Sequence, residues 1–319
     1  RWAVAHNPIP LIAITGSNAK TLVKEWLAAL LSEKFVVAKS PQSFNSQIGV
    51  PLSVWDLSEH HQIGVFEAGI SQQGEMEYLQ KILQPTMGIF TNIGEAHDRG
   101  FKDLAKKIDE KAKLFVGTQQ IVCRRDHYEV FDHLKGLYRD RIFDWSTMDP
   151  EACFYYKLSK NKASLQYKGV WYTFQLPFSF QIWIENVLHA LTAGLLCGLN
   201  QKILQKGLDK LKTLEMRLEI KKGINGCYLI DDTYNNDFQG LTVALDFLKQ
   251  QKQRQIKTVI LTDIQQSGLT DAHLYQKVNE LLVSQKINRL FTIGKQIAGF
   301  QNHFEIPTTA YLTLTDFLL

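Results

Sequence analysis

Short uninterrupted apolar runs alternate with amphipathic stretches of helical period along most of this chain. The first run is Leu11–Thr15, and a helical pattern follows at 21–31. Further strand-like runs lie at 35–39, 63–69, 87–94, 120–124 and 141–145, and a second helical pattern lies at 75–83. Apolar strands that do not alternate with polar residues, and that are separated by helices, form parallel sheets covered on both faces. The sequence therefore predicts an α/β fold on a mostly parallel sheet.

The pattern changes twice after this region. Residues 153–180 are rich in aromatic residues, alternate, and turn at Lys168-Gly169, which predicts antiparallel hairpins. Helical patterns follow at 184–198 and 201–211, and the α/β alternation then restarts, with strands at 228–230, 258–261 and 290–293 and helices at 239–249 and 273–284. We place a boundary near 212–216. This predicts a larger domain over 1–213 and a smaller Rossmann-like α/β domain over 214–319.

Composition and charge exclude several classes of protein. The 319 residues carry 36 Lys and Arg against 32 Asp and Glu, the basic residues are dispersed, and nucleic-acid binding is not expected. The most apolar stretch, 182–199, contains Glu185, Asn186 and His189, so membrane insertion is not expected. The chain opens without the apolar segment of a signal peptide. Its four cysteines are widely spaced, which indicates a reducing, cytoplasmic compartment.

The segment from Ile14 to Thr21, with the letters ITGSNAKT, has the layout of a phosphate-binding loop. A buried strand ends, a polar turn follows, and a helix begins whose amides and dipole favour anions. The residues expected to bind ATP here are Gly16, Ser17, Asn18, Ala19, Lys20 and Thr21. Lys20 would reach the β- and γ-phosphates, and the Thr21 hydroxyl would ligate Mg²⁺.

This loop departs from the usual G-x-x-x-x-G-K-[ST] pattern. Ile14 and Ala19 stand at its two glycine positions. If the position of Ala19 requires a positive φ, its methyl group costs about 1 kcal/mol or more. A plain strand–turn–helix connection without a ligand is therefore the alternative at this point.

The loop resembles that of the Mur ligase family, and four further blocks resemble that family in the same order. These blocks are SFNSQIGVPL at 43–52, FEAG at 66–69, TNIGEAH at 91–97 and DDTYNN at 231–236. The last block resembles the branch that joins D-alanyl-D-alanine to UDP-N-acetylmuramoyl-tripeptide. The family has a UDP-binding domain, a central ATPase and a C-terminal domain, so the resemblance implies a chain that lacks the first and truncates the last. Some members of this branch carry a fused alanine racemase domain, which would lie outside this chain.

The resemblance implies an ATP-dependent ligase of peptidoglycan precursor synthesis, with ATP and Mg²⁺ as cofactors and no membrane or nucleic-acid partner. A carboxylate of UDP-N-acetylmuramoyl-tripeptide would take the γ-phosphoryl group, and the amine of D-alanyl-D-alanine would attack the resulting acyl phosphate. Positioning and charge neutralisation carry most of such chemistry. The residues that the resemblance implies as catalytic are Lys20, His97 and Lys111.

The resemblance also implies metal ligands and binding residues. The Mg²⁺ ligands would be Thr21, Glu67, His97 and a carbamylated Lys111. The remaining ATP contacts would be Asn186, Arg217 and Asp232. Among the substrate-binding residues, Tyr234 and Asn235 would line the side of the incoming dipeptide, and Asn45 would contact phosphate or the carboxylate substrate. Two positions depart from the family's H-N-x-x-N helix start, because Glu185 replaces its histidine and His189 its second asparagine.

Each of these assignments has a structural alternative. Glu67 could be a solvated acid at a strand end, and His97 a structural hydrogen-bonding residue. Lys111 could lie on a basic, solvated helix face, and Lys106, Lys107 and Lys113 are near enough for a slip in alignment. Asp231 stands beside Asp232 and could take its role. For the whole chain, the alternatives are a folylpolyglutamate synthetase-like ligase and an ATP-binding fragment without turnover.

Overall fold

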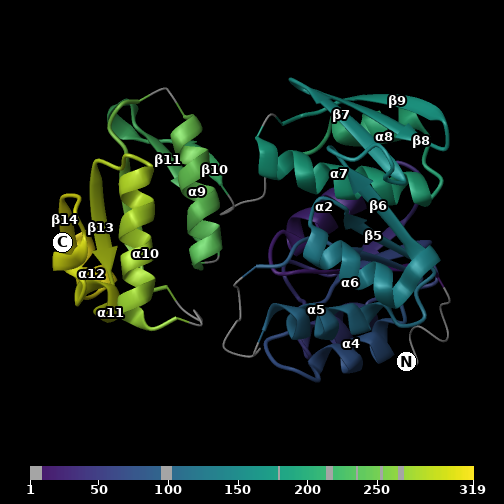
Figure 1. Ribbon diagram of the computed structural model, residues 1–319, viewed down its shortest axis with the longest axis horizontal. Coiled ribbons are helices and arrows are strands. Elements are labelled where there is room, and N and C mark those ends of the chain that lie inside the picture. The colour runs from purple at the N-terminus through teal and green to yellow at the C-terminus, as the bar shows by residue number, and fades with distance from the viewer. Residues whose placement is uncertain are drawn as a thin grey trace. The chain divides into compact units, whose positions relative to one another are not determined.

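The computed structural model describes residues 9–94, 103–178, 180–212, 218–234, 236–251, 254–264 and 269–319. The described residues form two compact units, unit 1 within 9–212 and unit 2 within 218–319 (Figure 1). Each unit has its own sheet and its own buried side chains. Within the described part of the chain, no helix is both long and apolar enough to cross a membrane.

Unit 1 is built on a nine-stranded sheet in the order β2-β3-β1-β4-β5-β6-β7-β8-β9. Neighbouring strands from β2 to β7 pair in parallel, and the last two pairs are antiparallel. The strands are β1 Leu11–Thr15, β2 Val37–Lys39, β3 Ile63–Glu67, β4 Met87–Phe90, β5 Gln120–Arg124, β6 Ile142–Ser146, β7 Phe154–Ser159, β8 Lys162–Tyr167 and β9 Val170–Gln175. The predicted parallel sheet with an antiparallel hairpin region is confirmed.

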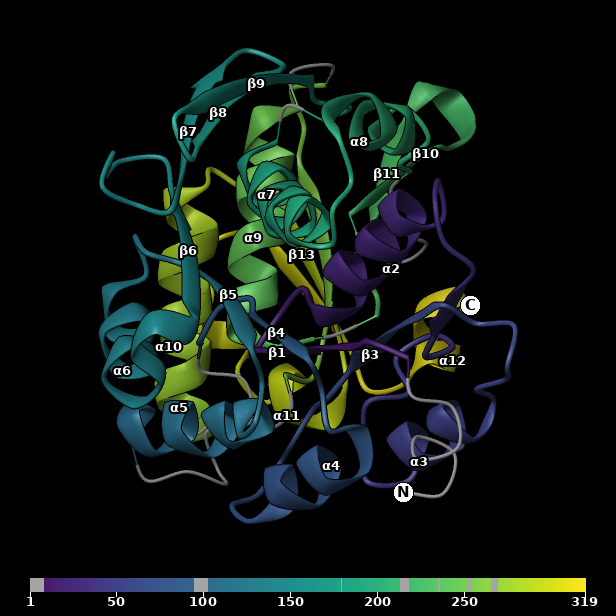
Figure 2. The same ribbon diagram turned by 90° about the vertical axis from the view of Figure 1, so that its right-hand side faces the viewer.

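Helices cover both faces of this sheet. One group, α2 (Lys20–Leu31), α7 (Gln181–Leu196) and α8 (Gln201–Leu208), lies on one face (Figure 2). The other face carries α3 Gly49–Trp55, α4 Glu75–Leu83, α5 Leu104–Ala112 and α6 Tyr128–Tyr138. All five residues of β1 and all five of β3 are buried, which explains why these strands show no polar alternation in sequence.

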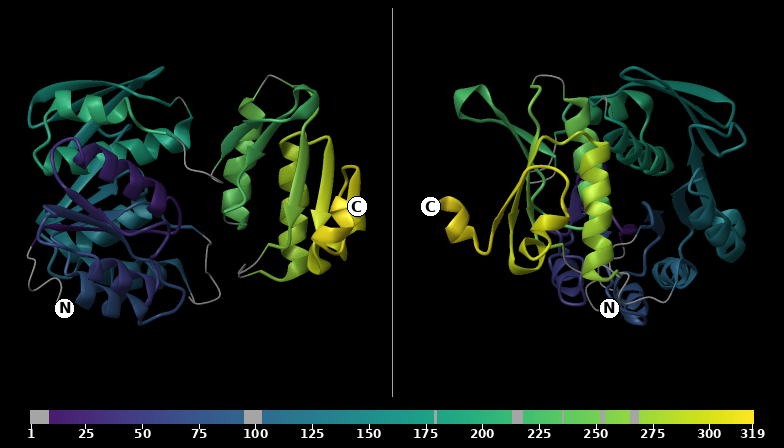
Figure 3. Two further views of the ribbon diagram at one scale, coloured as in Figure 1. Left: turned by 180° about the vertical axis from the view of Figure 1, so that it is seen from behind. Right: turned by 60° about the vertical axis from the view of Figure 1, so that its left-hand side comes forward.

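Unit 2 combines a hairpin with a small parallel sheet. Strands β10 (Glu219–Lys222) and β11 (Tyr228–Asp231) pair antiparallel, while β12, β13 and β14 form a parallel sheet. The remaining elements are β12 Thr258–Thr262, β13 Arg289–Ile293, β14 Thr308–Tyr311, α9 Phe238–Gln250, α10 Asp271–Ser284, α11 Lys295–Ala298 and α12 Leu314–Leu318. Leu274 and Val278 of α10 belong to the same buried apolar cluster as Leu261 and Leu290 of the sheet, and this cluster is the core of unit 2. Figure 3 shows α10 lying along the sheet.

Two strands end earlier than the apolar runs predict. β4 ends at Phe90. The Thr91 amide still donates to the Thr15 carbonyl of β1, but the Thr91 hydroxyl and the Asn92 side chain bond to the phosphate loop. β3 ends at Glu67, because the Gly69 amide bonds to the Asn45 carbonyl outside the sheet. Both ends lie at the carboxyl edge of the parallel sheet, where open α/β sheets bind ligands.

Candidate functional site

The turn between β1 and α2 has a backbone that two residues determine. Gly16 has φ 142°, and a Cβ added there would lie 2.0 Å from the Thr91 hydroxyl and 2.9 Å from the Asn92 carbonyl oxygen. Ala19, the N-cap of α2, has φ 66° and ψ 1°. It therefore takes the left-handed conformation that the glycine pattern anticipates, with the strain of a methyl group in that conformation.

The turn is held against the residues that follow β4. The Ser17 amide donates to the Asn92 carbonyl (2.9 Å), and the Asn18 amide donates to Asn92 Oδ1 (2.9 Å). The Thr91 hydroxyl donates to the Asn18 carbonyl (2.7 Å), and the Gly94 amide donates to Ser17 Oγ (3.0 Å). The predicted phosphate loop and the T-N-I-G block thus lie together, and in this structure the Ser17 and Asn18 amides are bonded to Asn92.

Two lysine side chains converge on the carbonyl oxygen of Gly16. Lys20 Nζ donates to the carbonyls of Gly16 (3.0 Å) and Ser17 (2.9 Å), and Lys111 Nζ donates to the same Gly16 carbonyl (3.1 Å). These two lysines come from α2 and α5, ninety-one positions apart in the chain. Lys20 thereby brings positive charge to the loop, where a phosphate chain would need it.

Lys111 is buried, with 2% of its surface exposed, so the alternative of a solvated helix face is wrong for this residue. Burial is the main reason that its pKa lies well below the ordinary lysine value, and the nearby charges of Lys20 and Lys107 lower it further. Lys107 is also buried, and its Nζ donates to the Gly94 carbonyl. Helix α5 therefore presents two buried amines, one turn apart, to the loops that end β1 and β4.

A second cluster surrounds Glu67 at the end of β3. Its carboxylate is fully buried and accepts from the Thr21 hydroxyl, at 3.0 Å to Oε2 and 3.3 Å to Oε1. Asn45 Nδ2 approaches Oε2 at 3.5 Å, and the hydroxyls of Thr21 and Ser43 lie 2.8 Å apart. The alternative of a solvated strand-end acid is therefore wrong for Glu67.

The third partner of Glu67 is Lys24, which sequence reasoning missed. Its side chain is fully buried, and its Nζ lies 3.4 Å from Glu67 Oε1. It also donates to the backbone carbonyls of Ser40 (2.7 Å) and Gln42. The signal was present in the sequence, because Lys24 follows Lys20 by four residues and so lies on the same side of the helix.

The predicted adenine end lies in α7, and its two departures from the family pattern have partners. Glu185 Oε2 accepts from Arg124 at 2.7 Å. His189 is fully buried, and its Nδ1 accepts from Trp145 Nε1 at 3.1 Å. Burial first, and then the charges of His127 and Arg124, lower the pKa of His189 to about 3, so its ring is neutral near pH 7. Asn186 is also buried, 3% exposed.

The predicted residues of unit 2 lie in the segment after β11. Asp232 accepts from the Leu218 amide at 3.2 Å, and Tyr234 is exposed. Asp231 is bonded to Lys221 (2.7 Å) and to the Thr233 hydroxyl (2.8 Å), and these bonds lower its pKa. Three other predicted residues, His97, Arg217 and Asn235, lie outside the described residues.

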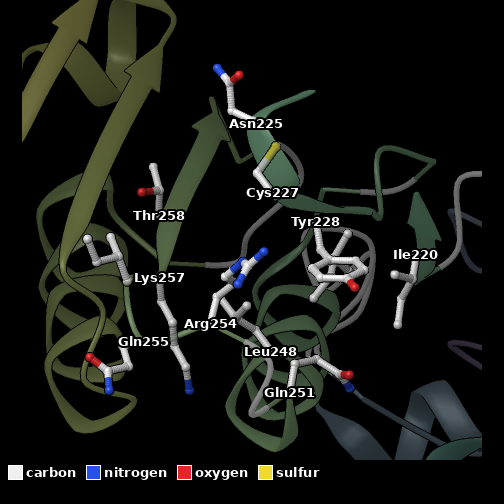
Figure 4. A pocket seen from close by; sticks show the side chains of 12 residues that line it. Ile220, Asn225, Cys227, Tyr228, Leu248, Gln251, Arg254, Gln255, Lys257 and Thr258 are labelled. Carbon is white, nitrogen blue, oxygen red and sulfur yellow. The ribbon is translucent and has the colours of Figure 1, made fainter. Parts of the chain in front are cut away.

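Unit 2 also contains a pocket of about 670 Å³, which none of the predicted site residues lines. It lies beside the β10–β11 hairpin and the end of α9, and Figure 4 shows the side chains around it. The guanidinium of Arg254 lies 6.0 Å from the centre of the Tyr228 ring and donates to the Gly226 carbonyl at 2.9 and 2.6 Å. The lining of the pocket is mostly apolar, and Arg254 and Lys257 are its cationic residues.

The structure brings together the part of the predicted site that belongs to unit 1. Lys20, Thr21, Glu67, Asn45 and Lys111 come from different segments and meet around the loop and the end of β3. Among the described residues, no three His, Cys, Asp or Glu side chains form a metal-binding group. All four cysteines are free thiols. Lys24, Ser43 and Asn92 complete the arrangement and were not predicted as site residues.

Curated relatives match most of the chain. A UDP-N-acetylmuramoyl-tripeptide–D-alanyl-D-alanine ligase of Bacillus subtilis is 27% identical over 318 residues, which cover 95% of this chain and 67% of that protein. A protein of the same name from Borreliella burgdorferi is 28% identical over 89% of this chain and 62% of its own length. This chain thus spans about two thirds of the length of these relatives.

Solved structures share the fold. A crystal structure of MurF from Acinetobacter baumannii matches with a TM-score of 0.85 and 23% identity, covering 99% of this chain and 70% of that one. MurF ligase from Thermotoga maritima, solved in complex with ADP, matches with a TM-score of 0.80 and 19% identity over 99% of this chain and 73% of that one. Folylpolyglutamate synthase from the same organism matches with a TM-score of 0.65 at 14% identity, over 98% of this chain and 85% of that one.

A protein-family pattern that matches a large part of unit 1 shows to which family this chain belongs. The pattern of the Mur ligase middle domain matches residues 14–194, more than half of the chain. This span begins one residue before the end of β1 and runs into α7, so it contains the phosphate loop, Glu67, Lys111 and Asn186. With the loop, the buried carboxylate and the two convergent lysines in place, the chain belongs to the Mur ligase family.

Proposed function

We propose that this chain carries the ATP-binding machinery of a ligase that joins D-alanyl-D-alanine to UDP-N-acetylmuramoyl-tripeptide in peptidoglycan precursor synthesis. Curated relatives from Bacillus subtilis and Escherichia coli are named for this reaction. The observation that carries the proposal is the convergence of Lys20 and Lys111 on the Gly16 carbonyl, beside the Thr21–Glu67 pair. A cytoplasmic location belongs to the proposal, because the reaction consumes ATP.

The proposed reaction has two steps. A carboxylate oxygen of the tripeptide bonds to the γ-phosphorus of ATP, and the bond to ADP breaks. The amine of D-alanyl-D-alanine then attacks the acyl carbon, phosphate leaves, and the amine loses a proton. Lys20 would neutralise charge on the transferred phosphoryl group, and the N-terminus of α2 would add the potential of its dipole.

The donor set at the end of β3 suits Mg²⁺. A hydroxyl and a carboxylate are hard oxygen ligands, and Thr21 and Glu67 already lie 3.0 Å apart. We propose that these two residues, with His97 and a carbamylated Lys111, would hold the ion. When bound, Mg²⁺ would offset negative charge on the phosphates.

Carbamylation of Lys111 requires a neutral amine, since the nitrogen lone pair must bond to the carbon of CO₂ while one proton leaves. Burial favours this state, because it lowers the pKa of Lys111. Incubation with ¹³C-labelled bicarbonate should give a carbamate NMR signal that is missing from the Lys111→Arg variant. If both proteins gave the same spectrum, Lys111 would not be modified.

The other contacts extend the proposal to both units. Asn186 and Asp232 would bind the nucleoside part of ATP, and Arg217 its phosphate or ribose. Tyr234 and Asn235 would line the side of the incoming dipeptide, and Asn45 would contact phosphate or the carboxylate substrate. Ser17 and Asn18 would bind phosphate through amides that now bond to Asn92. We propose that residues 1–213 and 214–319 correspond to the central and C-terminal domains of the family.

One observation favours a second candidate, nucleotide binding without turnover. Ala19 adopts φ 66° at the start of α2, and its methyl group strains the turn on which phosphate binding would depend. This candidate keeps the phosphate site and predicts Mg·ATP affinity without ligation of D-alanyl-D-alanine.

The test separates binding from turnover. We expect calorimetry to show Mg·ATP binding that Lys20→Ala abolishes, because the variant removes the cation at the loop. Lys202→Ala, on the exposed side of α8, is the control and should bind like the unchanged protein. Phosphate release with UDP-N-acetylmuramoyl-tripeptide should depend on D-alanyl-D-alanine and not on L-glutamate. Equal ATP affinity in Lys20→Ala would remove the loop from the site.

A further inference from the structure

Lys24 is a buried cation in α2 that the proposed chemistry does not use. None of its side chain is exposed, and four oxygen atoms surround its Nζ. Two are the backbone carbonyls of Ser40, at 2.7 Å, and Gln42. The others belong to the carboxylates of Glu67, at 3.4 Å, and Glu25, at 3.2 Å. The ammonium group thus joins α2, the segment after β2 and the end of β3.

Such a cation is costly to bury. An ammonium group loses its hydration, and only well-placed oxygen partners compensate for that loss. An unbranched apolar side chain of similar length, such as methionine, would fill the same space without this loss. A buried lysine at this position therefore needs another explanation than packing, and its partners supply one.

The first partner is the proposed magnesium ligand. Glu67 is held through both of its oxygen atoms, with Lys24 at Oε1 and the Thr21 hydroxyl at Oε2. Metal ligands generally depend on such surrounding contacts for their orientation. Lys24 also places a positive charge beside this carboxylate before any cation binds, so it compensates for the burial of Glu67.

The second partner is the segment that leads to Asn45, a predicted substrate-binding residue. Gln42 has φ 43°, a left-handed conformation that is uncommon for its residue type, and its carbonyl points to Lys24. Ser43 and Asn45 follow directly and contact Thr21 and Glu67. Lys24 therefore holds both the carboxylate and the segment that approaches it from the other side.

We propose that Lys24 is a positioning residue, which orients Glu67 for Mg²⁺ by joining its carboxylate to the backbone of residues 40–42. Lys24 acts through Glu67 and does not contact nucleotide. This inference rests on the proposed function, because it takes Glu67 as a ligand of the magnesium that accompanies ATP.

The experiment measures how strongly Mg²⁺ improves nucleotide binding. The dissociation constant of AMP-PNP, a non-hydrolysable ATP analogue, is measured by calorimetry in EDTA and in Mg²⁺, and the ratio of the two is the magnesium effect. We expect an effect of at least tenfold in the unchanged protein. Lys24→Met should reduce it at least fivefold, while the dissociation constant in EDTA changes less than twofold.

A control and a double variant make the test specific. Lys39→Met removes the exposed partner of Glu25 and should keep the full magnesium effect. Glu67→Gln should reduce the effect by itself, and adding Lys24→Met should then cause no further loss, because both changes act at one carboxylate. If Lys24→Met does not fold, Lys24→Gln replaces it, since the amide keeps hydrogen-bond donors and removes only the charge.

The possible results separate a failure of the positioning role from a failure of the proposed function. A full magnesium effect in the Lys24 variants, or an equal loss of affinity with and without Mg²⁺, would overturn the positioning role and leave the proposed function standing. An unchanged protein that binds no AMP-PNP, or binds it without any magnesium effect, would overturn the proposed function and this inference with it.

Discussion

At the scale of single residues, the phosphate loop is shaped by two backbone conformations. Gly16 has no room for a side chain, because Thr91 and Asn92 pack against its Cα. Ala19 has room but adopts φ 66°, which disfavours any residue with a Cβ. The sequence alone predicted that a positive φ at Ala19 would be strained, and it is the structure that supplies the angle. The strain is local, so a single substitution can remove it.

Ala19→Gly should therefore stabilise unit 1. Relief of the left-handed strain outweighs the greater freedom of glycine in the unfolded chain, and we expect a gain of roughly 0.5–1 kcal/mol in the free energy of unfolding. Urea unfolding of both proteins measures it. Ala28→Gly is the control in the same helix, where the backbone is helical and the change should cost about 1 kcal/mol. Destabilisation by both substitutions would contradict the strain at Ala19.

A buried histidine should make unit 1 sensitive to acid. The pKa of His189 is about 3 in the folded protein, and an unfolded histidine has a value near 6.5. Between these values the unfolded chain binds a proton that the folded chain does not, so stability falls as the pH falls below about 6.5. At pH 5 this loss is roughly 2 kcal/mol relative to pH 7.5.

His189→Asn should remove this part of the pH dependence. Asparagine stays neutral, and it is the residue that the family pattern has at this position. Unfolding free energies at pH 5 and pH 7.5 should differ less in the variant than in the unchanged protein, by about the 2 kcal/mol expected above. His60→Asn replaces an exposed histidine and should keep the original difference. An unchanged difference in His189→Asn would show that the buried ring does not cause it.

At the scale of elements, the interiors of strands and helices were predictable and several ends were not. Gln120–Arg124 and Glu75–Leu83 have the predicted bounds. The centre of the strand is a continuous buried run, and the helix buries Met76, Leu79 and Leu83 at helical spacing. The end of β4 depends on hydrogen bonds to a loop 73 or more residues earlier. Helix α3 was not predicted, and it holds Pro51 in its first turn, where the missing amide costs nothing.

Helix α4 has an N-terminus that another helix caps. Glu110 of α5 accepts from the amides of Gly74 (2.8 Å) and Met76 (3.1 Å), and it is 1% exposed. Glu110→Ala should lower the free energy of unfolding by roughly 3 kcal/mol, because it leaves the buried Met76 amide and the partly buried Gly74 amide without an acceptor and removes the ion pair with Lys113. Thermal and urea unfolding measure this loss.

Two further variants show whether the helix cap causes the loss of stability. Glu110→Gln keeps one acceptor oxygen and should cost less than the alanine variant. Glu77→Ala, in the first turn of α4, removes an exposed acid that pairs with Lys81, and unfolding should stay close to that of the unchanged protein. If Glu77→Ala were as destabilising as Glu110→Ala, the general charge of the helix and not the cap would be responsible.

At the scale of the whole molecule, the sequence predicted two α/β regions and most of the residues that gather in unit 1. The four-residue spacing from Lys20 placed Lys24 on the same side of α2, but it did not show which atoms Lys24 meets after folding, and the same is true of Ser43. Nor could the sequence predict the strand order, in which β1 lies between β3 and β4. Periodicity reports which face of an element is buried, while the partner on that face is decided by tertiary packing.

Because each unit has its own core, a core variant should destabilise its own unit. Leu27→Ala in α2 and Leu274→Ala in α10 each replace a buried leucine, at a cost of about 2–5 kcal/mol. Calorimetry should resolve two transitions, of which Leu27→Ala lowers one and Leu274→Ala the other. A single transition that both variants lower equally would mean that the two units unfold as one cooperative body, in spite of their separate cores.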